Sequence, residues 1–262
     1  MTPEVEEKLD RFFGGFAEGA NPLLLLDYDG TLAPFRMDRF KAHPWAGVRE
    51  RLNRIQRQKK TRMAAISGRP ATEVAALLAL ETPIEVWGLH GAERLYPDGR
   101  RELEKIPEDA HAKLDELRRR LKQDSLGGLF EDKPNAAVMH WRGAPPEEAG
   151  EIERRTRALF EPLARIEGLA LLKFEAGLEL RAGRDKGGAV KAVLQEAGAG
   201  EPVAFLGDDL TDEAAFRVVN NAIGSHLSVL MRREQRETEA DVWLRPPGEL
   251  RKFLDRWIAR IP

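Results

Sequence analysis

Four consecutive leucines at residues 23–26 lead directly into two aspartates separated by one residue, Asp27 and Asp29. An apolar run without alternation is typical of a strand buried on both faces, as in the parallel sheet of an α/β protein. Ligands bind at the carboxyl end of such strands, where the two aspartates follow, and Gly30 allows a sharp turn there. Crowded carboxylates repel each other, and a divalent cation would offset that repulsion. An ordinary Asp-Gly turn is the alternative interpretation.

A second acidic segment follows a later apolar run. Residues 207–213 read Gly-Asp-Asp-Leu-Thr-Asp-Glu, after the apolar segment 202–206. Acidic residues favour a helix start, so capping is the alternative explanation. Four carboxylates so close together need more than capping, because each pair about 4 Å apart costs roughly 1–4 kcal/mol in wet surroundings. The segment therefore predicts a metal site.

Two further segments carry polar groups where a helix is expected to begin. Residues 64–66 form an apolar run that leads into Ser67-Gly68-Arg69-Pro70. A hydroxyl and backbone N–H groups at a helix start can cradle a phosphate, although simple N-capping by Ser67 is the alternative. Lys186 opens a helix predicted over 186–197. The helix dipole disfavours a lysine there, so a contact between Lys186 and an anion explains it better than a surface position.

Apolar runs and helical patterns alternate along most of the chain. Strands are expected near 23–27, 62–66, 84–88, 202–206, 221–223 and 241–244. Helices are expected near 45–58, 71–80, 186–197, 212–219 and 247–260. This alternation predicts an α/β fold with a doubly wound, Rossmann-like parallel sheet covered on both faces.

The middle of the chain has its own pattern and reads as an insertion. We predict a core made of residues 1–104 and 184–262, with a smaller α/β cap at 105–183. The cap is expected to hold helices near 108–122 and 145–163, and strands near 129–132, 136–142, 169–174 and 177–182. Hinges are expected near 103–107 and 182–184.

Composition excludes several classes of protein. The chain has 262 residues, 33% of them charged, a net charge of −2 and no cysteine, so disulfides, cysteine-zinc sites and thiol nucleophiles are excluded. No apolar run is long enough to span a membrane, and the first residues lack a signal-peptide pattern, so we expect a cytoplasmic protein. The basic stretches 49–62 and 118–122 read as solvated helix faces rather than a nucleic-acid surface. We expect a monomer that binds neither nucleic acid nor membrane.

The four strand-end and helix-start motifs, in this order, resemble those of the haloacid dehalogenase superfamily of phosphotransferases. Other motifs are similar to those of one branch, the trehalose-6-phosphate phosphatases. They are Gly88-Leu89-His90-Gly91-Ala92-Glu93, Phe130-Glu131-Asp132-Lys133, His140-Trp141-Arg142 and Glu179-Leu180-Arg181. Together the matching motifs span residues 23–216.

This resemblance implies a haloacid dehalogenase fold, an inserted cap that closes over the site, and a role for each matching residue. Asp27 would be the nucleophile, Asp29 the acid and base, and Lys186 a third catalytic residue. The metal would be Mg²⁺, bound by Asp27, Asp29 (through its backbone carbonyl), Asp208, Asp209 and Asp212. The phosphate and the sugar would be bound by Thr31, Ser67, Gly68, Arg69, His90, Glu131, Lys133, Arg142 and Glu179.

The match departs from the family pattern just before Glu179. The family places a Gly-Lys pair there, whereas this chain has Glu175 or Ala176 at the lysine position, and Ala182 replaces a proline. Lys173 is a nearby replacement. The leading hypothesis is a phosphatase for trehalose 6-phosphate. The alternatives are a phosphatase for another phosphorylated glycoside (glucosyl- or mannosyl-glycerate, glycosylglycerol or sucrose phosphate) and a catalytically silent sugar-phosphate-binding domain.

Overall fold

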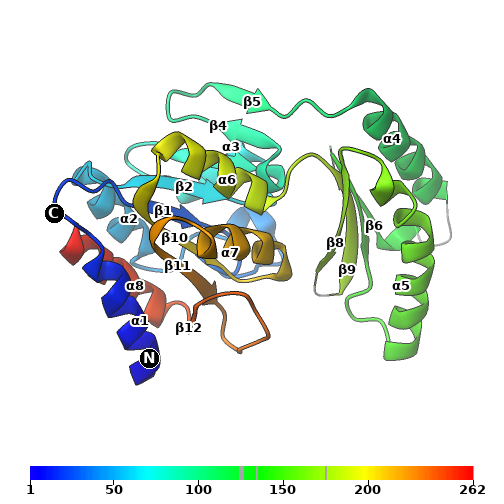
Figure 1. The fold of residues 1–262 in the computed structure, drawn as a ribbon. Helices are drawn as coiled ribbons and strands as arrows, with labels where there is room; N and C mark the ends of the chain where they lie inside the picture. Colours follow the sequence, from blue (N-terminus) through cyan, green and yellow to red (C-terminus); the bar gives the residue numbers. More distant parts are fainter. Residues whose placement is uncertain (124–126, 134, 175, 262) are drawn as a thin grey trace. The chain divides into compact units, whose positions relative to one another are not determined.

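The computed structural model describes residues 1–123, 127–133, 135–174 and 176–261. Its chain forms two compact units (Figure 1). The core unit comprises Met1–Leu103, Asp185–Asp208 and Asp212–Pro262, and the small unit comprises Glu104–Arg184 with Asp209–Thr211. None of the helices in the described stretches has the length and apolar character that a membrane span requires.

The core unit is built on an eight-stranded sheet of order β12-β11-β10-β1-β2-β3-β4-β5. Its strands are β1 (Leu23–Leu26), β2 (Arg62–Ile66), β3 (Glu85–Gly88), β4 (Glu93–Leu95), β5 (Arg101–Leu103), β10 (Gly200–Gly207), β11 (Gly224–Met231) and β12 (Val242–Leu244). The six strands from β12 to β3 are parallel, as predicted, whereas β4 and β5 add two antiparallel strands at one edge. The short connections between these last strands permit only antiparallel pairing.

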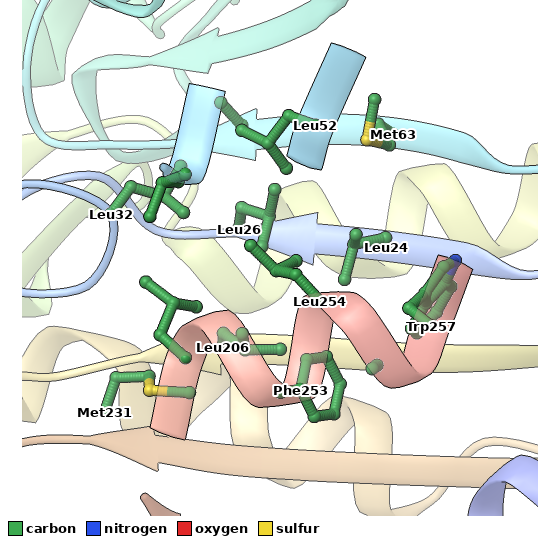
Figure 2. Packing of buried hydrophobic residues seen from close by; sticks show 14 of the residues in the cluster. Leu24, Leu26, Leu32, Leu52, Met63, Leu206, Met231, Phe253, Leu254 and Trp257 are labelled. Atoms are coloured by element: carbon green, nitrogen blue, oxygen red, sulfur yellow. The ribbon is translucent and has the colours of Figure 1, made fainter. Parts of the chain in front are cut away.

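β1 lies at the centre of this sheet, and its leucines are buried on both faces. Leu24 and Leu26 pack into one hydrophobic cluster, with side chains from α8 and neighbouring strands (Figure 2). Leu23 and Leu25 pack into a second cluster. All four are at most 1% exposed. Successive side chains of a strand point to opposite faces, so the four leucines pack into the hydrophobic clusters on both faces of the sheet.

Helices cover both faces of the core sheet. They are α1 (Pro3–Gly14), α2 (Val48–Arg57), α3 (Ala71–Leu78), α6 (Lys186–Ala197), α7 (Glu213–Asn220) and α8 (Gly248–Arg260). Buried side chains of α1, α2, α3 and α8 belong to the first cluster, and those of α6 and α7 to the second. The predicted doubly wound α/β fold is therefore confirmed.

Two parts of the core unit differ from the sequence prediction. The strand predicted near 221–223 is wrong, because β11 begins at Gly224 and runs to Met231. Its apolar run is interrupted by Ser228, which is fully buried and hydrogen-bonded to Asp241. Helix α1 was not predicted, although Thr2 caps its start and three apolar side chains of the helix are buried.

The small unit has a four-stranded antiparallel sheet of order β6-β7-β9-β8 and two helices. The strands are β6 (Phe130–Lys133), β7 (Ala136–His140), β8 (Leu169–Phe174) and β9 (Gly177–Ala182), and the helices are α4 (Glu108–Gln123) and α5 (Pro146–Phe160). Apolar residues of α4, α5, β7 and β9 form one cluster between the helices and one sheet face. The opposite face carries polar residues.

Candidate active site

The carboxyl ends of neighbouring core strands bring the predicted motifs together. β1 lies between β10 and β2 in the sheet, and Leu26 is in register with Leu206 and Ala65. Asp27, Ser67 and Asp208 therefore leave the sheet at the same edge. The backbone N–H of Asp27 donates to the Leu206 carbonyl at 2.8 Å, which fixes the start of this turn.

Asp27, Lys186 and Asp212 form a buried group of charges at this edge. The Lys186 ammonium lies 2.7 Å from a carboxylate oxygen of Asp27 and 2.7 Å from one of Asp212. All three side chains are at most 4% exposed. Lys186 begins helix α6, which Asp185 caps by accepting from the Gly188 N–H. The sequence prediction that Lys186 contacts an anion is met here by the two carboxylates.

Burial and charge together shift the titration of this group. Burial raises the pKa of the Asp27 carboxyl to about 7, and the neighbouring Lys186 ammonium opposes that shift. Burial also lowers the pKa of Lys186, but Asp212 and Asp27 outweigh burial and raise it above its usual value. Two carboxylates share one ammonium, so negative charge is in excess. A cation beside Asp27 would lower its pKa and keep it ionised at neutral pH.

Asp208 adds a third carboxylate beside this group. Oxygen atoms of Asp27, Asp208 and Asp212 lie within 4.8 Å of one another, and all three residues are buried. Gly30 makes this approach possible, because a Cβ atom at that position would collide with the Asp208 carboxylate. The three acids carry two more charges than Lys186 neutralises. Their oxygen donors and excess charge fit a hard divalent cation such as Mg²⁺.

The other two predicted metal ligands are placed differently. Asp209 is half-buried and does not join this three-carboxylate cluster of described residues. The Asp29 side chain is also outside the cluster, and its carboxylate forms a two-pronged ion pair with Arg69. The proposed metal contact of Asp29 is through its backbone carbonyl, which that ion pair leaves unaffected.

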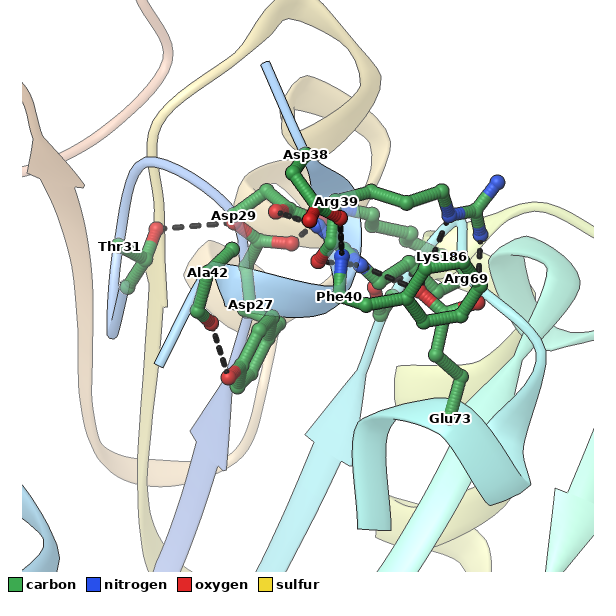
Figure 3. Close-up of polar contacts among 12 residues, drawn as sticks. Asp27, Asp29, Thr31, Asp38, Arg39, Phe40, Ala42, Arg69, Glu73 and Lys186 are labelled. Atoms are coloured by element: carbon green, nitrogen blue, oxygen red, sulfur yellow. Dashed lines mark hydrogen bonds and ion pairs between the residues drawn. The ribbon is translucent and has the colours of Figure 1, made fainter. Parts of the chain in front are cut away.

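The predicted phosphate-binding hydroxyls are buried at the same edge. Thr31 donates to a carboxylate oxygen of Asp27 at 2.9 Å (Figure 3). Ser67 accepts from the Arg69 N–H at 3.2 Å. Both residues are at most 1% exposed. Thr31 therefore orients Asp27 directly, and Ser67 shapes the loop that contains Gly68 and Arg69.

The start of helix α3 differs from the predicted phosphate cradle. Pro70 is the N-cap and offers no side-chain cap. The Ala71 N–H instead donates to the buried Glu93 carboxylate at 2.7 Å. Capping by Ser67 is thus wrong, and the first helical N–H is satisfied by β4 rather than left for a ligand. The sequence motif containing Glu93 was recognised, but its acceptor role was not.

His90 lies against this loop and has an unusual backbone. Leu89 and His90 both have positive φ angles, 50° and 59°, followed by Gly91 at 111°. The His90 N–H donates to the Ser67 carbonyl at 2.8 Å. The His90 ring occupies the space that a Cβ atom on Gly68 would need. His90 therefore lies beside the predicted phosphate loop, and its ring leaves room only for a glycine at position 68.

The predicted sugar-binding residues lie in the small unit. Strand register places Glu131, Lys133 and Glu179 on the polar sheet face. Lys133 lies 3.2 Å from Glu179, and Glu131 lies 2.9 Å from His140. Arg142 is exposed, beyond the end of β7, and has no hydrogen bond or ion pair to any described residue.

The suggested replacement for the missing family lysine is not supported. Lys173 is in register with Leu178 on the helix-covered side of the sheet, and it binds Glu153 of α5 at 2.8 Å. Glu179 lies on the opposite face. The other residue at that position, Glu175, lies outside the described residues, and Ala176 has a positive φ of 61°.

The sheet order and the acidic strand ends define a haloacid dehalogenase-like fold. A haloacid dehalogenase-like hydrolase from B. subtilis superposes with a TM-score of 0.63 at 18% identity, covering 90% of this chain and 98% of that one. At that identity the likeness concerns the fold. The predicted fold class is confirmed.

The comparison with family patterns is more specific. The trehalose-phosphatase pattern matches residues 25–245, and the chain belongs to that family of hydrolases. The trehalose-phosphate phosphatase of Mycolicibacterium paratuberculosis is 29% identical, and the match covers 98% of this chain but 66% of that protein, just under two thirds of its length. The C-terminal domain of C. albicans trehalose-6-phosphate phosphatase superposes with a TM-score of 0.78 at 21% identity, covering 96% of each chain.

Proposed function

We propose that this chain is a Mg²⁺-dependent phosphatase that hydrolyses trehalose 6-phosphate to trehalose and phosphate. The observation that carries the proposal is the buried group in which Lys186 binds Asp27 and Asp212, with Asp208 as a third carboxylate. Membership of the trehalose-phosphatase family supports the reaction, and the names of its relatives support the substrate.

Asp27 is the proposed nucleophile, because an ionised carboxylate needs no base before it attacks phosphorus. The Asp27 oxygen bonds to phosphorus while the bond from phosphorus to the sugar oxygen breaks, which gives an aspartyl-phosphate. Asp29 protonates the departing oxygen. Asp29 then takes a proton from water, whose oxygen attacks phosphorus while the bond from phosphorus to the Asp27 oxygen breaks, which releases inorganic phosphate and restores the Asp27 carboxylate. Lys186 and Thr31 hold the Asp27 carboxylate during both steps.

The three buried carboxylates would hold the cation. When bound, Mg²⁺ supplies positive charge that stabilises the phosphoryl oxygens. The two oxygens of Asp212 already accept from the Lys186 ammonium and from the Asp208 N–H. Asp212 therefore orients both Lys186 and Asp208, in addition to supplying negative charge. Asp209 is proposed to bind waters around the cation.

We assign sugar recognition to the polar face of the small unit, which we propose is the cap. Glu131 and Glu179 can accept hydrogen bonds from sugar hydroxyls, and Lys133 can donate them. The sequence departs from the family pattern just before Glu179, where the Gly-Lys pair is missing. The same face could therefore suit another phosphorylated glycoside.

A phosphate-release assay tests the proposal. The substrates are trehalose 6-phosphate, sucrose phosphate, glucosylglycerate phosphate and 4-nitrophenyl phosphate, each with Mg²⁺ and after thorough chelation. We expect the highest kcat/KM with trehalose 6-phosphate and no turnover after chelation. Preference for another glycoside would overturn the substrate, undiminished turnover without metal would overturn the mechanism, and binding without turnover would indicate a silent domain.

A further inference from the structure

Arg69 uses its whole guanidinium group to hold polar partners around Asp29. Its Nε and Nη2 atoms donate to the two Asp29 carboxylate oxygens at 2.6 and 2.7 Å (Figure 3). Its Nη1 atom donates to the Arg39 carbonyl at 2.7 Å and to the Glu73 carboxylate. The Arg69 side chain is 10% exposed. A planar guanidinium in this fork fixes the carboxylate plane as well as its distance.

Arg69 is itself anchored on its outer side. Glu73, in the first turn of α3, binds Arg69 and also accepts two hydrogen bonds from Arg39, at 2.7 and 3.1 Å. Arg39 lies in the short 3₁₀ helix Arg39–Lys41, which Asp38 caps. The order of contacts is therefore Arg39, Glu73, Arg69 and Asp29. Asp29 is therefore oriented through two segments that are distant from it or from each other in sequence, one at Arg39 and one at residues 69–73.

The turn after β3 holds the backbone of Arg69 in place. The Leu89 N–H donates to the Arg69 carbonyl at 2.9 Å, and the adjacent His90 N–H donates to the Ser67 carbonyl. Leu89 and His90 adopt left-handed backbone conformations in making these bonds. Such conformations cost about 1–3 kcal/mol each and persist only where the surroundings require them. The turn therefore fixes the backbone position from which the Arg69 side chain extends.

We infer that Arg69 is a positioning residue for the Asp29 carboxylate, rather than a ligand of the substrate. The inference rests on the proposed function, in which Asp29 exchanges a proton first with the sugar oxygen and then with water. Both exchanges need the carboxylate within hydrogen-bonding reach of an atom that changes between steps. Because Arg69 binds both carboxylate oxygens of Asp29, the carboxylate keeps one orientation through both proton transfers.

The test is a double-mutant cycle of Arg69→Lys with Asp29→Asn, measured with trehalose 6-phosphate and with 4-nitrophenyl phosphate. Lysine keeps the charge but cannot form the fork. We expect Arg69→Lys to lower kcat for the sugar ester about 10- to 50-fold with KM within about threefold. In the Asp29→Asn background the same change is expected to alter kcat less than about threefold, because Arg69 then has no acid to position.

Arg57→Lys is the matched control, since Arg57 forms the same two-pronged pair with Glu81 on the surface. We expect it to leave both kinetic constants unchanged. Glu73→Gln is a second variant in case Arg69→Lys fails to fold. It loosens the outer anchor and is expected to lower kcat about threefold, again only when Asp29 is present.

Three outcomes would overturn the inference. Losses that multiply in the double mutant would show that Arg69 acts independently of Asp29. A raised KM with unchanged kcat would make Arg69 a substrate ligand. An unchanged kcat in both Arg69→Lys and Glu73→Gln would remove the positioning role. An inactive parent chain, by contrast, would overturn the proposed function and this inference with it.

Discussion

The acidic pocket of the core unit and the polar face of the small unit use charged residues in opposite ways. In the pocket, Asp27 and Lys186 are 4% exposed and each contacts partners at fixed, short distances. On the polar face, Glu131 and its partner His140 are about two-fifths exposed. Buried charges interact strongly and cannot be exchanged for water, whereas half-exposed pairs contribute little to stability.

This difference separates chemistry from recognition. The pocket is preorganised by buried ion pairs and by glycines that leave no room for a side chain, so its geometry has little freedom to change. On the polar face, the Glu131–His140 pair is weak and solvated, whereas Glu179 is buried and paired with Lys133. We therefore expect substitutions in the pocket to affect every substrate, and substitutions on the polar face to affect the sugar alone.

The largest expected effect comes from Asp27→Asn. The change keeps the shape but removes the nucleophilic charge, so turnover of trehalose 6-phosphate and of 4-nitrophenyl phosphate should both fall by at least about 10³-fold. Steady-state phosphate release and a thermal melt measure activity and folding. A folded variant with more than a trace of activity would contradict the assignment of the nucleophile.

Gly30→Ala should damage the pocket without replacing any of its acidic residues. Gly30 has a φ of 79°, and an added Cβ atom would collide with the Asp208 carboxylate. We expect kcat to fall about 10- to 100-fold for both esters, and the Mg²⁺ concentration needed for half-maximal activity to rise. Gly99→Ala is the control, because Gly99 has a φ of 88° and open space around it. It should lose about 1 kcal/mol of stability but keep full activity.

Glu131→Ala should affect the sugar ester selectively. Removing this half-exposed carboxylate is expected to raise KM for trehalose 6-phosphate about tenfold and to leave 4-nitrophenyl phosphate unchanged. Glu151→Ala, at an exposed ion pair of helix α5, is the matched control and should change neither. Equal effects of Glu131→Ala on both esters would contradict the division between the two regions.

The smallest expected effect concerns Glu196, which lies near the end of helix α6. The hydrogen bond from Arg94, aided by Arg62, lowers its pKa from 4.5 to about 2. A lowered pKa means that the carboxylate stabilises the folded state above about pH 4.5, and that this contribution is lost as the pH falls toward 2. Glu196 is 43% exposed, so the contribution should not exceed about 1 kcal/mol.

Urea unfolding at several pH values checks this prediction. Glu196→Gln should be slightly less stable than the parent at pH 7, and the difference should disappear near pH 2. A constant difference across that range would show that the loss is one of packing rather than of charge. The parent protein and Glu196→Gln should have the same kcat/KM at pH 7, because the described partners of Glu196 are Arg62 and Arg94, outside the pocket.

The convergence of acids was predictable from the sequence, because each follows or closely borders an apolar run that had to be a parallel strand. Asp27 and Asp208 could be placed at one edge on that basis alone, whereas Lys186, which opens a helix, was grouped with them only by the family resemblance. The Arg69–Asp29 pair could not be predicted. It depends on which way an arginine leaves its loop, and that direction is set by hydrogen bonds from the turn after β3.

The remaining differences in the fold have similar causes. Strands β4 and β5 are short, and β5 is fully exposed, so they lack an apolar pattern. The capping of α3 by Glu93 depends on β4 lying beside β3. Contacts of this kind join segments through tertiary structure, so they cannot be predicted from the spacing of residues along the chain.

The central position of β1 has a consequence for biosynthesis. One edge of this strand pairs with β2, but the other pairs Leu23 with Val203, and that partner leaves the ribosome long afterwards. Until then, four leucines and a free strand edge are available to other chains. A truncated product that ends before β10 would keep this edge unpaired and should aggregate, whereas the full chain should not.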